Sequence, residues 1–170
     1  SYVEVVSLSN INYRVDLSGI TDVTVGGYTI NNVYMVTLRN IHTQYNSSLA
    51  YPMYGTYKML CYVNDCAKIS VVTSPVRVVG DNTCHGLSIA GMTYFAADYG
   101  DHVYDIRGCY RALYILAAKV YLRKLQNGGT TNAIGMWARS MAHVGLQEAP
   151  ASGFASTNYA KTDGALVYIG

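Results

Sequence analysis

ALYILAAKVYL, residues 112–122, is a nearly uninterrupted apolar stretch, and its pattern decides the fold that the sequence predicts. Apolar residues recur here with the 3.6-residue period of an α-helix, so we predict a helix over His102–Gln126. Asp101 is a suitable N-cap, and Asn127-Gly128-Gly129 is an abrupt C-terminal stop. A helix that is apolar nearly all round is buried on more than one side. We therefore expect another subunit to cover part of it.

The residues before this helix alternate with a period of two, which is typical of β-strands. Turn signals such as Gly26-Gly27 divide them into short runs, of which Thr56–Asn64 is one strand. A second, shorter helix is expected over Thr130–His143. No internal repeat and no second domain is evident. We predict a single domain, residues 1–170, that is mainly β in 1–97, helical in 102–143, and ends in a tail, 147–170, with a short terminal strand at Ala165–Ile169.

Strands first and helices last define the α+β class. We predict an N-terminal hairpin, from Tyr2–Leu8 and Asn12–Leu17, and an antiparallel β-meander, followed by two C-terminal α-helices that pack on one sheet face of a dimer. The residues that we expect at the dimer interface lie on the apolar helix: Leu113, Leu116, Ala117, Val120 and Tyr121.

The composition predicts an ordinary hydrophobic core, but the residues left to form the surface are unusual. Charged residues make up 13% of the chain, about half of the roughly 25% that is usual, whereas there are 17 tyrosines against two phenylalanines and one tryptophan. Protein interfaces are enriched in aromatic residues and depleted in Lys and Glu. This favours a self-assembling structural protein, and the alternative is a Tyr-rich β domain of a secreted monomer. The net charge of +2 does not indicate a strongly basic nucleic-acid arm.

One strand has a face suited to RNA. Alternation in Thr56–Asn64 places hydrogen-bonding side chains, one cation and one aromatic ring on the same side. Cations bind phosphates and aromatic rings stack on unpaired bases, so such a face is a candidate RNA site, and a solvated sheet face is the alternative. The candidate RNA-binding residues, drawn from this strand and its expected neighbours, are Lys58, Tyr62, Asn64, Thr56, Arg39 and Lys68.

The cysteines do not form a diagnostic motif. Cys61 and Cys66 are spaced C-x4-C, and the even count of four permits two disulfides, although we expect free thiols. A nucleophile at Cys84 would need an imidazole from His85, or from a distant His42, His102 or His143. Adjacent side chains on a strand point to opposite faces, which argues against Cys84 with His85. Without a phosphate-binding glycine motif or zinc spacing, we predict no enzyme activity, no cofactor and no metal.

The order of elements resembles the coat proteins of single-stranded RNA bacteriophages. The likeness covers about Tyr2–Ala142: a hairpin, an antiparallel meander, a strand of the Gly86–Ala97 type, a long helix, a glycine break and a shorter helix. The resemblance implies a dimer with one continuous sheet, interlocked helices above it, and an opposite face that binds genomic RNA. No sequence motif of that family matches residue by residue, and the tail from about Gln147 to Gly170 is additional.

We therefore predict a virion coat protein whose partners are itself, as a homodimer and a larger assembly, and single-stranded RNA. No stretch reaches 18 consecutive apolar residues, so no membrane partner is expected. The predicted location is the virion, with an extracellular location as the alternative. A phage tail-tube or extracellular filament subunit is the first alternative function, and a secreted monomeric binding domain or cysteine enzyme is the second.

Overall fold

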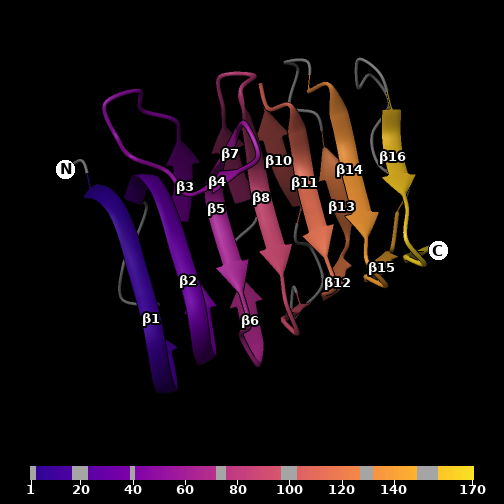
Figure 1. Cartoon of the computed structure of the whole chain (residues 1–170), viewed down its shortest axis with the longest axis horizontal. Coiled ribbons are helices and arrows are strands. Elements are labelled where there is room, and N and C mark those ends of the chain that lie inside the picture. The colour runs from indigo at the N-terminus through magenta and orange to yellow at the C-terminus, as the bar shows by residue number, and fades with distance from the viewer. Residues whose placement is uncertain are drawn as a thin grey trace.

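The chain is a parallel β-solenoid (Figure 1). The computed structural model describes residues 3–16, 23–38, 41–71, 76–96, 103–126, 132–148 and 157–170, and every regular element within these ranges is a strand. The coils stack along one axis, with the N-terminus at one end and the C-terminus at the other. Within the described ranges, no helix is long and apolar enough to cross a membrane.

The strands form three columns, in which each strand pairs in parallel with the strand of the next coil. The first column contains β1 (Val3–Asp16), β2 (Val23–Leu38), β5 (Tyr57–Asn64), β8 (Cys84–Ala90), β11 (Arg111–Leu116), β14 (Ile134–Arg139) and β16 (Thr157–Lys161). The second contains the later part of β2, then β6 (Lys68–Val71), β9 (Tyr94–Ala96), β12 (Lys119–Leu122), β15 (His143–Leu146) and β17 (Leu166–Ile169). The third contains β3 (Ile41–Gln44), β7 (Val76–Val79), β10 (Val103–Arg107) and β13 (Lys124–Gln126).

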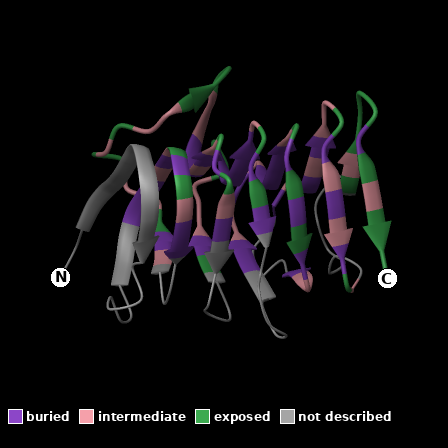
Figure 2. Ribbon diagram, turned by 90° about the horizontal axis from the view of Figure 1, so that it is seen from below, coloured by how far each residue is buried: buried purple, intermediate pink, exposed green. Residues whose placement is uncertain are grey.

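Ladders of apolar side chains fill the interior, because equivalent residues of successive coils lie directly above one another. In the first column Val63, Ile89 and Ile115 are in register, and each has at most 1% of its surface exposed. In the second column Phe95 and Val120 stack in the same way. Figure 2 shows the buried positions running through the middle of the stacked coils. Each fully buried side chain of this size contributes roughly 1.5–3 kcal/mol, so the ladders supply most of the driving force for folding.

The corner between the first and second columns is built from residues with positive φ. Asp65 (φ 50°), Gly91 (φ 66°) and Ala117 (φ 54°) occupy this corner in successive coils. Gly91 is required there, because a Cβ at position 91 would lie 2.0 Å from a carboxylate oxygen of Asp65. One left-handed residue turns the chain from one sheet to the next and shifts the alternation by one position.

The predicted α+β fold is therefore wrong, and the corner explains why. Interior positions Leu113, Ile115, Ala118 and Val120 are spaced by two, three and two residues, because the corner at Ala117 interrupts the alternation. These spacings sum to seven, which imitates the repeat of an amphipathic helix. The predicted helix His102–Gln126 corresponds to β10, β11, β12 and β13. The apolar stretch 112–122 forms most of β11 and all of β12. Each of these strands lies between two parallel neighbours, where continuous apolar runs are expected.

Other predictions are corrected in the same way. The second helix, Thr130–His143, corresponds to β14 and the start of β15, although residues 130 and 131 lie outside the described ranges. The N-terminal hairpin is instead the single strand β1, and the meander is parallel; among the strand pairs described, only β4 (Met53–Tyr54) with β5 is antiparallel. Gly26-Gly27 lies within β2 and is not a turn. The strands predicted at Thr56–Asn64 and Ala165–Ile169 are confirmed to within one residue.

Candidate functional site: a tyrosine face on one flank

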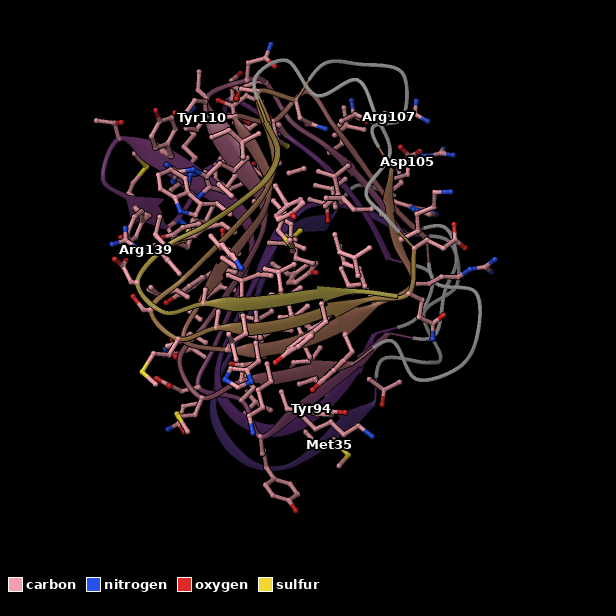
Figure 3. The ribbon with its side chains drawn as sticks, turned by 90° about the vertical axis from the view of Figure 1, so that its right-hand side faces the viewer. Met35, Tyr94, Asp105, Arg107, Tyr110 and Arg139 are labelled. Carbon is pink, nitrogen blue, oxygen red and sulfur yellow. The ribbon has the colours of Figure 1, made fainter. Side chains whose placement is uncertain are left out.

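Exposed apolar side chains gather on the outer side of the second column. We call this surface the tyrosine face and define it by Met92, Tyr94, Tyr121, Met141, Leu166 and Tyr168. Met92 has 86% of its surface exposed, and Tyr168 has 63%. Figure 3, which looks along the stack of coils, shows Tyr94 projecting outward from this flank, away from Tyr110 and Arg139 on a second flank. Exposed apolar side chains that cluster on one surface mark an interaction site.

The register of the parallel strands creates this face. Outward positions of successive coils align, so Lys119 lies beside Tyr94 on one side and beside His143 on the other. In the next outward row, Tyr121 and Tyr168 lie on either side of Gly145. A Cβ at Gly145 would lie 2.7 Å from the ring of Tyr121, so the glycine lets this ring lie flat against the sheet.

A groove of about 490 Å³ runs beside these residues, at the corner between the first and second columns. It is lined by Met92, Tyr94, Ala117, Ala118, Lys119, Ser140, Met141 and His143. Among these lining residues none is acidic, and Lys119 and His143 are the titratable nitrogen bases. The tyrosine face is thus apolar and aromatic, with a sparse positive character.

A second cluster covers the outer side of the first column, where β4 folds back over β8 and β11. At its centre is Arg111, which has only 8% of its surface exposed. The guanidinium carbon lies 3.8 Å from the ring centre of Trp137 and 5.1–5.6 Å from those of three tyrosines: Tyr57, Tyr110 and Tyr114. Tyr57 and Tyr110 stack nearly parallel with their centres 4.3 Å apart. Cation–π contacts of this kind contribute about 0.5–2 kcal/mol each.

The electrostatics of this cluster depend on His85. Arg111 Nη1 lies 3.2 Å from Nε2 of His85, which is fully buried. Burial and, to a smaller extent, the nearby Arg111 charge together lower the pKa of His85 to about 3. The imidazole is therefore neutral and accepts the hydrogen bond that the guanidinium donates. Burial also lowers the pKa of Arg111, and among the described ion pairs none gives Arg111 a carboxylate partner.

Acidification from pH 7 to pH 5 is expected to destabilise the protein by about 2 kcal/mol through His85 alone. The folded-state pKa of about 3 lies below the ordinary value of 6.5, so the unfolded chain takes up the proton first as the pH falls. The stability is present above pH 6.5 and is lost between pH 6.5 and pH 3. Urea unfolding at both pH values measures the difference. A His85→Gln variant should lose most of this pH dependence, and an equal dependence in the variant would contradict the assignment.

The structure does not bring the predicted RNA-binding residues together on one face. Lys58, on β5, donates a hydrogen bond to the Tyr45 hydroxyl and has its amine 3.9 Å from Asp81. Asn64 donates to the side-chain oxygen of Asn31 at 2.9 Å, so it belongs to an asparagine pair between successive coils. Tyr62 is partly exposed on the first column, Thr56 is in the exposed β4–β5 turn, Lys68 is on the second column, and Arg39 lies outside the described residues.

The predicted interface residues divide between the inside and the outside of the solenoid. Leu113 and Val120 are fully buried within the protomer, and Leu116 is partly buried. Ala117 is exposed at the corner and lines the groove, and Tyr121 belongs to the tyrosine face. The sequence reasoning did not identify the rest of this face, because Met92, Tyr94, Met141, Leu166 and Tyr168 align only once the coil repeat is known.

Among the described residues, Cys84 and its neighbour His85 point to opposite sides of the strand. Cys84 faces the interior beside Cys109, whereas His85 faces the outer aromatic cluster, as strand alternation predicts. His143 lies in the groove, and His102 is outside the described residues. All four cysteines are buried free thiols. Within the described ranges, no three His, Cys, Asp or Glu side chains gather closely enough to hold a metal ion.

The fold and this face define a class: a parallel β-solenoid with an aromatic, charge-poor surface on one flank. No protein-family model, no curated protein and no solved structure matches the chain.

Proposed function

We propose that the chain is a self-assembling structural subunit of a virion or an extracellular assembly, and that it binds a second copy of itself through the tyrosine face. The observation that supports this proposal is the gathering of six exposed apolar side chains on the outer side of one column. A closed interface between two copies buries the same patch on both, so one chain supplies both halves of the contact.

The charge distribution favours a second copy as the occupant. Only 13% of the residues are charged and the net charge is +2, so two copies repel each other weakly. Near the tyrosine face, Lys119 lies between Tyr94 and His143, and a Tyr ring on the partner can cover its amine. A strongly acidic or basic partner has no matching charge cluster among the groove-lining residues.

The bacteriophage coat resemblance does not contribute to this proposal. It rested on two C-terminal helices, and strands occupy those positions. RNA binding stays a prediction from residue types, since Tyr62 and Lys68 lie on different columns and the Lys58 amine already contacts Tyr45 and Asp81. The proposal keeps the assembly function and replaces the interlocked helices with contact between solenoid flanks.

A double substitution, Tyr121→Glu with Tyr168→Glu, is expected to weaken self-association at least tenfold. It places two carboxylates in one outward row of the face, on either side of Gly145, where burial against a partner leaves each charge without compensation. Sedimentation velocity over a concentration series gives the dissociation constant. Tyr54→Glu is the matched control, because Tyr54 is 37% exposed but lies on β4, over the outer side of the first column.

The control should associate like the native chain, and circular dichroism should show that all three proteins fold alike. A native chain that stays monomeric at every concentration would contradict the proposal. So would equal weakening by Tyr54→Glu and by the double substitution. A monomer would instead favour the groove as the site of a different ligand.

A further inference from the structure

Cys84 and Cys109 meet inside the solenoid, although they belong to successive coils. Cys84 begins β8, and Cys109 lies in the corner that precedes β11. Their Sγ atoms are 3.8 Å apart, and both side chains are fully buried. The Tyr110 N–H donates to the Cys84 carbonyl at 2.9 Å, so the two backbones are held together beside the sulfur atoms.

The space around the two sulfurs is kept open by a glycine of the preceding turn. A Cβ at Gly80 would lie 2.6 Å from Sγ of Cys84 and 2.6 Å from Sγ of Cys109. Gly80 is itself fixed, because its N–H donates to the Arg107 carbonyl at 2.8 Å. The sulfurs therefore need to approach by about 1.8 Å to reach the roughly 2.05 Å of a disulfide, without a side chain between them.

The other two cysteines are engaged elsewhere. Cys61 Sγ lies 3.3 Å from the Thr43 hydroxyl, and burial raises the pKa of this thiol to about 12. Cys66 Sγ lies 3.3 Å from the Asn64 carbonyl, at the corner between β5 and β6. The contact with Cys109 lowers the pKa of Cys84, whereas the pKa of Cys109 is raised well above its usual value.

We propose that Cys84 and Cys109 form a disulfide site, which cross-links successive coils when the chain folds under oxidising conditions. The oxidant is a small disulfide such as oxidised glutathione. The Cys84 thiolate attacks one sulfur of the oxidant, which releases one glutathione thiol and leaves a mixed disulfide. Cys109 then attacks the Cys84 sulfur and releases the second glutathione. Two protein thiols are oxidised to one disulfide, and one glutathione disulfide is reduced to two thiols. This inference is independent of the proposed self-association.

The test is to refold the full chain in a buffer of reduced and oxidised glutathione and to quench it with acid. Peptide mapping by mass spectrometry should show one cross-link, between Cys84 and Cys109, with Cys61 and Cys66 free. Closing a loop of 25 residues should raise the thermal midpoint by roughly 5–10 °C over the reduced protein. Adding a reductant should reverse that shift.

Two variants separate this pair from a general effect of thiols. Cys61→Ser removes a cysteine outside the pair, and its refolded product should keep the cross-link. Cys84→Ser should give a product with three free thiols and no thermal shift. The native-chain peptide map decides the matter even if Cys84→Ser does not fold. Four free thiols in the refolded native chain, or a cross-link to Cys61 or Cys66, would overturn the proposal.

Discussion

Ile115→Asp is expected to unfold the protein at neutral pH. Ile115 has no exposed surface and lies in the first-column ladder between Ile89 and Ala138. The change removes about 1.5–3 kcal/mol of apolar burial and places a carboxylate in the ladder without a partner, which costs several kcal/mol more. The sum is roughly 5 kcal/mol or above, comparable to the whole stability of a domain of this size. Circular dichroism and urea unfolding measure the loss.

Ala117→Asp is the matched control, two residues along the chain. Ala117 is exposed at the corner with φ 54°, a conformation that Asp tolerates better than most residues. We expect a change in unfolding free energy within about 0.5 kcal/mol. A helix buried on more than one side, with Ala117 in a dimer interface as the sequence pattern predicted, would be damaged by both substitutions. Equal damage from the two variants would therefore contradict the solenoid.

Asn132→Ala is expected to cost about 3 kcal/mol, the second largest effect. Asn132 is fully buried, and its side-chain oxygen accepts a hydrogen bond from the Cys109 N–H at 2.7 Å. Its amide nitrogen donates to the Ile106 carbonyl at 2.6 Å. Alanine leaves both backbone groups buried and unpaired, at about 1–3 kcal/mol each. Chemical denaturation of both proteins gives the difference.

Asn46→Ala provides the comparison at an exposed turn. The Asn46 side-chain oxygen accepts hydrogen bonds from the N–H and hydroxyl of Ser48, both in contact with water. Water replaces these bonds when the side chain is removed, so the expected loss is below about 1 kcal/mol. If Asn132→Ala cost no more than Asn46→Ala, the buried amide would not hold the corner.

Some of the strands in the first half and the last strand could be predicted from the sequence, but the strands over 103–146 and the arrangement of the coils could not. Alternation located Thr56–Asn64, which has buried and partly exposed positions, and an apolar run located Ala165–Ile169, which lies mostly exposed at the end of the stack. The helix over His102–Gln126 was wrong because the corner at Ala117 adds one residue to the alternation. Local patterns cannot distinguish that insertion from a true helical period.

The signal that could have shown the solenoid is the coil repeat. Val63, Ile89, Ile115 and Ala138 follow one another at intervals of 26, 26 and 23 residues, within the range that indicates stacked coils. The interval is longer in the earlier coils, where Ile30 and Val63 are 33 residues apart, so the period is not constant. This variation, caused by loops of different length, hid the repeat.

The sequence predicted the kind of surface that forms the candidate site, but not most of its residues. The low charge and the 17 tyrosines predicted an interaction surface, and Tyr121, chosen as an interface residue, is an exposed member of the tyrosine face. Leu113 was chosen from the assumed helix, whereas it is buried inside the solenoid. Tyr94 and Leu166 needed the register between coils, which composition does not contain.

The most direct measurement of the central claim, the parallel solenoid, is a methyl NOESY spectrum with isoleucine δ1 groups labelled. The solenoid places Ile89 and Ile115 on adjacent strands, about 4.8 Å apart in the backbone, although 26 residues separate them. We predict a strong Ile89–Ile115 cross-peak. Amide contacts between residues three apart throughout 112–122, without that cross-peak, would show a helix and contradict the account.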